Sequence, residues 1–277
     1  MPSPLDAVAS ALGERFEVER ELGRGGASTV YAGRDRTTGR PVAIKVLRPE
    51  LAVAIQATRF RNEIALLAEL NHPNVLPLIA TEESGKLVYY AMPLAEGGSL
   101  RDRLDAVRQL PLGDTIAVTR DVAAALDYAH GRNVLHRDIK PENIVFVEGR
   151  VMLCDFGVAR ALVRAGGERL SSTGLVIGTP SYMSPEQARG ESELDGRTDV
   201  YSLACVTYEM LIGEPPFTGP NPQTVMARQL KAPPPSLRVV RPDVSEKTER
   251  AIHRALAKKP KDRPRTAGEF VQGLGPP

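Results

Sequence analysis

A polar loop near the middle of the chain constrains the fold more than any other segment. Residues 136–143 read His-Arg-Asp-Ile-Lys-Pro-Glu-Asn, and Asp155-Phe156-Gly157 follows after a run of apolar residues. The two segments supply a base, a cation and two oxygen ligands for a metal ion, which are the groups that phosphoryl transfer requires. The β-branched and apolar residues around them predict short strands that bracket the loop.

Two segments closer to the N-terminus extend this pattern. Residues 23–30 read Gly-Arg-Gly-Gly-Ala-Ser-Thr-Val, and their glycines would let backbone amides approach phosphate oxygens. By itself this segment predicts a plain hairpin turn equally well. Lys45 ends the strand-like run at residues 42–44, and a cation buried there needs a partner. Glu63, on the apolar face of a helix predicted over residues 55–70, would be that partner, in a structural ion pair or at a phosphate site.

These motifs together resemble the catalytic domain of eukaryotic-type (Hanks-type) serine/threonine protein kinases, in the bacterial receptor-type branch. The resemblance implies an α+β, bilobal protein-kinase fold. Its N-lobe, residues 16–96, would be a small antiparallel sheet with one main helix, and its C-lobe, residues 97–272, would be larger and mainly helical. Residues 1–277 would form a single kinase catalytic domain, with residues 273–277 as the start of a linker.

The pattern of apolar residues favours the same division of the chain. Short strands rich in β-branched residues are predicted up to about residue 90, and helices are predicted after about residue 100. One helix is expected to begin at an N-cap, Asp114, and to end at Gly131. Residues 199–212 are apolar almost all round, which is typical of a helix at the centre of a lobe.

The resemblance gives the polar loop specific catalytic roles. It implies that Asp138 accepts the hydrogen bond of the substrate hydroxyl as catalytic base, and that Lys140 neutralises charge on the transferred phosphoryl group. Asn143 and Asp155 would hold the metal, expected to be Mg²⁺ with Mn²⁺ as the alternative. The lysine at position 140 is similar to the serine/threonine branch and differs from the tyrosine branch.

The resemblance also implies an ATP site in the cleft between the lobes. Lys45 would bind the α- and β-phosphates, and Glu63 would position Lys45. Backbone groups of residues 92–95 would contact adenine, and Ser28 stands where the family pattern has glycine. The expected ATP-binding residues are Leu22, Gly23, Gly25, Gly26, Ser28, Val30, Ala43, Lys45, Met92, Pro93, Ala95 and Val145.

Further motif residues are expected to support the site rather than to react. Glu186 should form an ion pair with Arg263, and Asp199 should bind backbone amides of the catalytic loop. His136 is interpreted as a packing residue. The full set of expected supporting residues is His136, Arg137, Phe156, Thr179, Glu186, Asp199 and Arg263.

An arginine before the catalytic base suggests regulation. Arg137 precedes the expected base, and the resemblance implies that such an arginine binds a phosphate on the activation segment. The ordering of that segment then completes the site. The expected phosphorylation sites are Ser171 and Thr173, modified by a second copy of the chain in trans. A homodimer through the N-lobes is a further expectation from the bacterial resemblance.

Composition narrows the classes of partner and compartment. With 36 basic and 34 acidic residues, the formal net charge is +2, which does not favour a nucleic-acid or membrane-surface binder. Cys154 and Cys205 lie in apolar runs, which indicates buried thiols in a reducing compartment. Residues 200–212 form the longest apolar stretch and are too short to span a bilayer. The domain is therefore expected to be cytoplasmic, in a protein that is membrane-anchored elsewhere.

The first functional hypothesis is a serine/threonine kinase that transfers the ATP γ-phosphoryl group to proteins and activates itself by autophosphorylation. The alternative is a nucleotide-binding pseudokinase that acts as a scaffold or switch, which Ser28 and Pro93 favour. A third hypothesis, a kinase of small molecules, is disfavoured by residues 178–180, Gly-Thr-Pro, which resemble a segment that receives a peptide.

Overall fold

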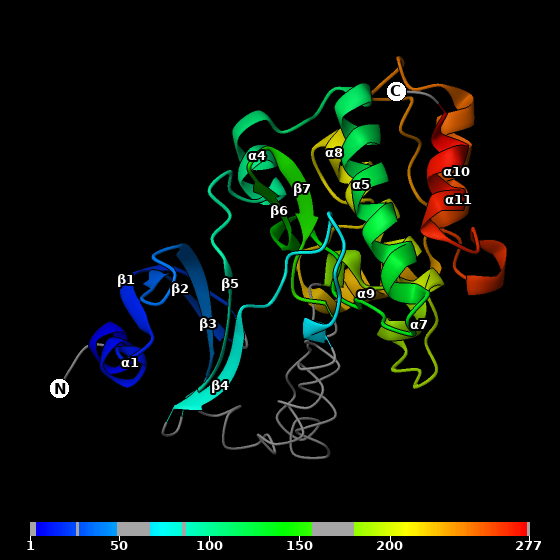
Figure 1. Cartoon of the computed structure of the whole chain (residues 1–277). Coiled ribbons are helices and arrows are strands. Elements are labelled where there is room, and N and C mark those ends of the chain that lie inside the picture. Colours follow the sequence, from blue (N-terminus) through cyan, green and yellow to red (C-terminus); the bar gives the residue numbers. More distant parts are fainter. Residues whose placement is uncertain (1–3, 26–27, 49–66, 85–86, 157–179, 276–277) are drawn as a thin grey trace. The chain divides into compact units, whose positions relative to one another are not determined.

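The computed structural model describes residues 4–25, 28–48, 67–84, 87–156 and 180–275 of the chain (Figure 1). Most of the helix predicted over residues 55–70 lies outside these residues. The same is true of Gly26, Glu63, Gly157, Ser171, Thr173 and Thr179. The described residues form two compact units, and the chain passes from the first to the second between residues 96 and 97, although residues 72–75 also belong to the second unit.

The first unit contains a five-stranded antiparallel sheet, as the resemblance predicts for the small lobe, and a helix before the sheet that was not predicted. The strand order is β1-β2-β3-β5-β4. The strands β3 and β5 lie inside the sheet, and most of their residues are apolar and buried. The elements are α1 (Pro4–Leu12), β1 (Phe16–Arg24), β2 (Ser28–Asp35), β3 (Pro41–Leu47), β4 (Ala80–Ser84) and β5 (Leu87–Pro93).

The two faces of this sheet carry different side chains because successive residues of a strand point to opposite faces. Val42, Ile44 and Val46 of β3 share one face and pack in a single apolar cluster with Val8 and Leu12 of α1. Helix α1 therefore covers that face of the sheet. Ala43 and Lys45, the intervening residues of β3, point to the opposite face.

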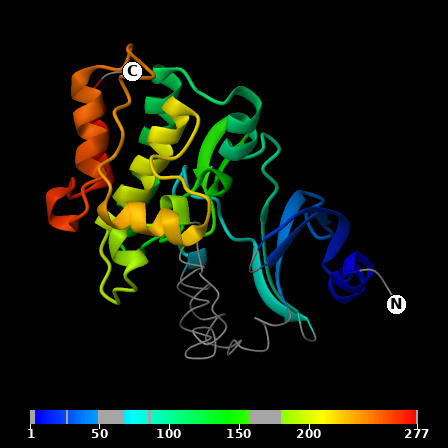
Figure 2. The same cartoon turned by 180° about the vertical axis from the view of Figure 1, so that it is seen from behind.

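The second unit is mainly helical and is built around one buried helix. Every residue of α8 from Thr198 to Leu211 is buried, which confirms the central helix predicted from its all-round apolar sequence. Helix α8 contacts α5, α10 and α11, and Figure 2 shows it, in yellow, against the green α5. The helices are α4 (Leu100–Val107), α5 (Leu112–His130), η1 (Pro141–Asn143), η2 (Pro180–Tyr182), α7 (Pro185–Ala188), α8 (Arg197–Ile212), α9 (Pro222–Lys231), α10 (Glu246–Ala255), η3 (Pro260–Asp262) and α11 (Ala267–Leu274).

A two-stranded hairpin in this unit follows the polar loop, whereas the sequence pattern predicts strands on both sides of it; residues 131–140 contain no strand. Strands β6 (Ile144–Val147) and β7 (Arg150–Leu153) pair antiparallel directly after the loop. The start of the unit is fastened to this hairpin at Gly97, whose amide donates to the Phe146 carbonyl at 3.0 Å. A Cβ atom at Gly97 would lie 2.7 Å from Phe146 Cβ, so only glycine fits this close approach.

Two element boundaries differ from the sequence-based predictions. Helix α5 begins at Leu112 with Pro111 at its N-cap, so Asp114 lies in the first turn instead of capping the helix. A proline suits a helix start because its fixed φ is already close to helical. Helix α11 continues to Leu274, so the linker predicted from residue 273 does not begin there. Leu274 is buried, and its carbonyl accepts a hydrogen bond from the Thr248 hydroxyl, which holds the last turn.

Two other sequence-based expectations concern the thiols and the membrane. Cys154 and Cys205 are both buried, and neither forms a disulfide in the described part of the chain. Among the helices that the structure describes, none combines the length and the apolar character needed to cross a membrane.

Candidate active site

A buried carboxylate fixes the backbone of the polar loop. Asp199, in the first turn of α8, is fully buried. Its Oδ2 accepts from the backbone amide of His136 at 2.9 Å, and its Oδ1 accepts from the amide of Arg137 at 2.8 Å. His130, from the end of α5, contacts the same Oδ2 through Nε2 at 2.7 Å. The predicted contact of Asp199 with loop amides is therefore present, and His130 is an additional partner.

The Asp199–His130 contact shifts the pKa of both groups. Burial alone would raise the pKa of Asp199, but the hydrogen bond and charge of His130 lower it on balance. Burial alone would lower the pKa of His130, but the hydrogen bond and charge of Asp199 raise it above its usual 6.5. The loop is thus held by a carboxylate whose charged form is stabilised by an imidazolium.

The His130–Asp199 pair predicts a dependence of stability on pH. Because the pKa of His130 is raised on folding, its contribution is fully present below pH 6.5 and is lost as the pH rises through the folded-state pKa. We expect His130→Gln to lower the free energy of unfolding more at about pH 6 than at about pH 9, on the two sides of an ordinary histidine pKa. Urea unfolding at both pH values measures the difference. A pH-independent effect would contradict the ion pair.

His136 has a packing role, as the sequence analysis expects. Its ring is fully buried and lies edge-on to Phe156, with 4.8 Å between the ring centroids. Its Nδ1 accepts from the amide of Asp138 at 3.2 Å, and its Nε2 lies 2.8 Å from the carbonyl oxygen of Cys154. These partners require a neutral ring with its proton on Nε2. His136 therefore joins the loop to the segment that carries Asp155.

The carboxylate of Asp138 is held by two neighbours in the loop. Its Oδ2 lies 2.8 Å from Lys140 Nζ and 3.3 Å from Asn143 Nδ2. Asn143 Nδ2 also donates to the Asp138 carbonyl at 2.7 Å. Neither carboxylate contact uses Oδ1, so that atom can accept the hydrogen bond of an incoming hydroxyl. The side chains of Asp138 and Lys140 are 24% and 21% exposed, so the group is reachable but oriented.

Two oxygen ligands lie at neighbouring backbone positions. The amide of Cys154 donates to the carbonyl of Asn143 at 2.9 Å, which brings the next residue, Asp155, beside the end of the loop. Since Asn143 uses Nδ2 to bind Asp138, its Oδ1 is the atom left for a cation. An amide oxygen and a carboxylate suit Mg²⁺, which prefers oxygen ligands and completes its shell with phosphates and water. The residues therefore fit the implied metal.

Two residues of this region adopt a backbone conformation that is uncommon outside glycine. Arg137 has φ of 70° and Asp155 has φ of 64°. Such conformations are unfavourable and often accompany functional sites, where surrounding contacts hold them. At Arg137 two hydrogen bonds provide those contacts. The Arg137 amide donates to Asp199, and Gln187 Nε2 donates to the Arg137 carbonyl at 2.8 Å.

The expected nucleotide residues of the first unit gather on one face of its sheet. Strand register pairs Val30 with Lys45 and Lys45 with Tyr90, and it pairs Ala43 with Met92. Paired residues point to the same face, so these side chains lie opposite the face that α1 covers. Lys45 Nζ lies 5.8 Å from the centroid of the Tyr90 ring. Four expected residues of the ATP site, Val30, Ala43, Lys45 and Met92, are thus brought together on this face.

Other expected nucleotide residues lie around the first hairpin and the end of β5. Leu22 and Gly23 belong to β1, and Leu22 is 40% exposed. The amide of Gly25 donates to the carbonyl of Ser28 at 2.8 Å, and Ser28 itself is buried at the start of β2. Pro93 ends β5, and Ala95 follows it, both half-buried. Val145 lies in β6 of the second unit.

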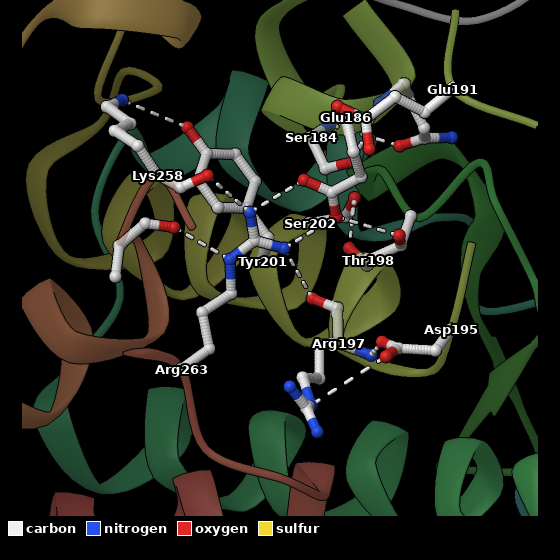
Figure 3. A network of polar contacts seen from close by, with 12 residues as sticks. Ser184, Glu186, Glu191, Asp195, Arg197, Thr198, Tyr201, Ser202, Lys258 and Arg263 are labelled. Atoms are coloured by element: carbon white, nitrogen blue, oxygen red, sulfur yellow. Dashed lines mark hydrogen bonds and ion pairs between the residues drawn. The ribbon is translucent and has the colours of Figure 1, made fainter. Parts of the chain in front are cut away.

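The predicted ion pair of Glu186 and Arg263 is present and completely buried. Each nitrogen of the Arg263 fork lies 2.7 Å from a different Glu186 oxygen (Figure 3). Thr198 Oγ1 also donates to Glu186 at 2.8 Å. Arg263 donates further to the carbonyls of Ala257 and Arg197, at 2.7 and 2.9 Å. Burial would raise the pKa of Glu186, but Arg263 lowers it on balance.

Sequence reasoning missed two residues that fasten this site, His130 and Gln187. His130 stands at the end of a helix with no local partner, so only the fold reveals its contact with Asp199. Gln187 carries a local signal, because Ser184 and Gln187 have the spacing of a capping box. The structure contains that box at the start of α7, and the Gln187 amide nitrogen also reaches Arg137.

Comparisons with known proteins agree with this geometry. Residues 16–273 match the protein kinase domain family. The chain is 41% identical over 273 residues to serine/threonine-protein kinase PknB of Mycobacterium tuberculosis, covering 96% of this chain and 43% of PknB. It is 38% identical over 266 residues to the probable serine/threonine-protein kinase SCO3848 of Streptomyces coelicolor, covering 94% of this chain and 39% of that protein. The chain therefore spans less than half the length of these curated relatives.

Solved structures give the same assignment over nearly the whole chain. The crystal structure of the Mycobacterium tuberculosis PknI kinase domain superposes with a TM-score of 0.74 at 31% identity, covering 94% of both chains. A structure of Rad53 residues 1–466 superposes with a TM-score of 0.77 at 25% identity, covering 94% of this chain and 65% of that chain. The chain belongs to the protein kinase domain family, in the branch of the bacterial Hanks-type serine/threonine kinases.

Proposed function

We propose that this chain is the catalytic domain of a serine/threonine protein kinase, which transfers the γ-phosphoryl group of ATP to serine and threonine hydroxyls of proteins. The proposal rests on one observation above all, the position of the Asp138 carboxylate between Lys140 Nζ at 2.8 Å and Asn143 Nδ2 at 3.3 Å. A base, a cation and a metal ligand on one short loop can align a hydroxyl with a phosphoryl group.

In this proposal the loop residues divide the work of transfer. Asp138 Oδ1 accepts the hydrogen bond of the substrate hydroxyl and takes its proton as the hydroxyl oxygen bonds to the γ-phosphorus and the bond from that phosphorus to the bridging oxygen of ADP breaks. Lys140 neutralises charge on the phosphoryl oxygens in the transition state. Asn143 Oδ1 and the Asp155 carboxylate would hold Mg²⁺, or Mn²⁺ in its place. When bound, the metal ion neutralises phosphate charge and orients the nucleotide.

Protein kinases use ATP and divalent metal ions. We assign the nucleotide to the sheet face that carries Val30, Ala43, Lys45 and Met92, with Lys45 on the α- and β-phosphates and Glu63 as its positioning partner. Rad53, whose structure resembles this chain, was solved in complex with AMP-PNP, a nucleotide of the same class as ATP, which supports the assignment.

The regulation and partners of the chain are part of the proposal. Arg137 would bind a phosphate on Ser171 or Thr173, which a second copy of the chain adds in trans. Supporting this, the backbone of Arg137 is fixed on both sides, by Asp199 and by Gln187. We further propose that the N-lobes pair in a homodimer and that the domain works in the cytoplasm.

The rival hypotheses receive less support. The pseudokinase is not favoured, because the 41% identical relative is named a serine/threonine-protein kinase and every catalytic residue of the loop is present. For a kinase of small molecules, no observation adds support beyond the shared base and metal ligands.

The test is incubation of the chain with Mg-ATP and casein, followed by mass spectrometry of both proteins. We expect phosphate on serine or threonine of casein, and on Ser171 or Thr173 of the chain. No phosphate on either protein, with ATP binding retained, would favour the scaffold. Phosphate on an added aminoglycoside or sugar, with none on protein, would favour the small-molecule kinase.

A further inference from the structure

A line of buried hydrogen bonds ends on the backbone of η2. Gln229, from α9, donates from Nε2 to the carbonyls of Ser181 and Pro180, at 2.7 and 3.2 Å. Its Oε1 accepts from the hydroxyl of Tyr201, on α8. That hydroxyl lies 3.4 Å from Lys258 Nζ, as Figure 3 shows for the labelled Tyr201 and Lys258. Gln229 and Tyr201 are fully buried.

The chemistry of the groups fixes the direction of every bond in this line. Carbonyls only accept, so the nitrogen of the Gln229 amide must face η2 and its oxygen must face Tyr201. The Tyr201 hydroxyl donates to that oxygen and can accept from Lys258. Burial lowers the pKa of Lys258 to about 8, so its donating ammonium form still dominates at neutral pH. Lys258 Nζ also lies 3.8 Å from the centroid of the Phe217 ring, which holds the ammonium in place.

The helix η2, at the end of this line, has few hydrogen bonds within itself and depends on contacts with α8 and α9. As a single turn of 3-10 helix, η2 has few internal hydrogen bonds. Ser202 Oγ donates to the carbonyl of Tyr182 at 2.8 Å, and the Tyr182 hydroxyl donates to Glu209 at 2.6 Å. These contacts fasten the last residue of η2, while Gln229 fastens the first two. The amide of Met183 also donates to the Pro180 carbonyl, at 3.3 Å. Loss of the Gln229 contacts would therefore loosen Pro180 and Ser181 without releasing Tyr182.

Pro180 is the last residue of the segment, residues 178–180, that resembles the peptide-receiving segment of the family, and Ser181 follows it directly. We propose that Gln229, oriented by Tyr201, is a positioning residue for the protein substrate: it fixes the backbone at Pro180 and Ser181 and so sets the affinity for the acceptor protein. This inference rests on the proposed function and names a residue that determines the affinity of that site for its protein substrate. Gln229 does not touch the reacting atoms, so its effect should appear in binding of the acceptor rather than in chemistry.

The experiment compares the parent chain with Gln229→Met, which keeps the length of the side chain but removes both polar atoms. We expect the KM for casein to rise roughly five- to tenfold at saturating ATP, with kcat and the KM for ATP within about twofold of the parent. Tyr201→Phe removes only the hydroxyl that orients the amide, and it should raise the KM for casein by a smaller factor. In the double variant the two effects should be less than additive, because both act on one contact.

Gln223→Met is the matched control, since Gln223 is exposed on the same helix. It should leave every kinetic constant unchanged. If Gln229→Met fails to fold, Tyr201→Phe alone decides, because it keeps the ring that Lys258 and Arg263 contact. An unchanged KM for casein in a folded variant overturns the positioning role alone, and so does an equal loss of kcat and of ATP affinity. A parent chain that phosphorylates neither casein nor a second copy of itself overturns the proposed function and the positioning role with it.

Discussion

Asp138→Asn is expected to lower kcat for phosphoryl transfer by roughly 10²- to 10⁴-fold, the usual contribution of a general base. The amide has the size of the carboxylate but cannot take a proton from the substrate hydroxyl. It also cannot form the ion pair with Lys140 Nζ, now at 2.8 Å. Initial rates of phosphate transfer to casein at saturating Mg-ATP measure the effect. The KM for ATP should stay close to that of the parent chain, because the proposed nucleotide contacts do not include Asp138.

The stability of this variant separates a catalytic role from a structural one. The Asp138–Lys140 pair is partly exposed, and such pairs contribute about 1 kcal/mol or less. Asp138→Asn should therefore unfold near the temperature of the parent chain. Asp114→Asn, at an exposed position of α5, is the control and should change neither activity nor unfolding. Full activity in the folded Asp138→Asn variant would show that another group accepts the proton.

Much of the catalytic loop could be predicted because its function depends on local sequence. The base, the cation and the metal ligand lie within six residues, from Asp138 to Asn143, so any compact loop keeps them close together in space. The contacts of Asp138 with Lys140 and Asn143 illustrate this. The burial of α8 was predictable for a similar reason, since a helix that is apolar on all sides is stable only inside a core.

Contacts between distant segments were predictable only where the family resemblance supplied both partners. Glu186 and Arg263 are 77 residues apart, and their motifs predict the pair. No motif points from Asp199 to His130. From the sequence, a histidine at the end of a helix is as consistent with an exposed residue that caps the helix as with a buried partner of Asp199. The hydrogen bonds from Lys258 through Tyr201 to Gln229 join α8, α9 and the segment between α10 and η3, and no sequence motif points to them.

Element ends were the weakest predictions because several residues compete to define them. Asp114 is a good N-cap by composition, but Pro111 lies three residues earlier and also suits a helix start. At the other end of the chain, Gly273 resembles the start of a linker. The buried side chain of Leu274 instead continues α11 by one residue beyond that glycine. At Leu274 tertiary packing, rather than local propensity, sets the boundary, whereas at α5 one local preference outweighs another.

Glu186→Gln is expected to lower the free energy of unfolding by about 3–5 kcal/mol, the usual result of removing one partner of a buried ion pair. Arg263 is 1% exposed, so the variant would leave a buried guanidinium whose charge has lost its carboxylate. Urea unfolding at neutral pH measures the loss. Arg254→Met is the matched control: it breaks the exposed Arg254–Glu269 pair and should cost at most about 1 kcal/mol.

The double variant Glu186→Gln, Arg263→Met separates the value of the pair from the penalty of a lone charge. If the penalty dominates, the double variant will be more stable than Glu186→Gln alone, because no buried charge remains. The pH dependence gives an independent check. The folded-state pKa of Glu186 is lowered, so its contribution is present above pH 4.5 and is lost as the pH falls through the folded-state value. The stability gap between the parent chain and Glu186→Gln should therefore narrow in acid, and a gap that stays constant would mean that Glu186 acts only through its shape and its hydrogen bonds.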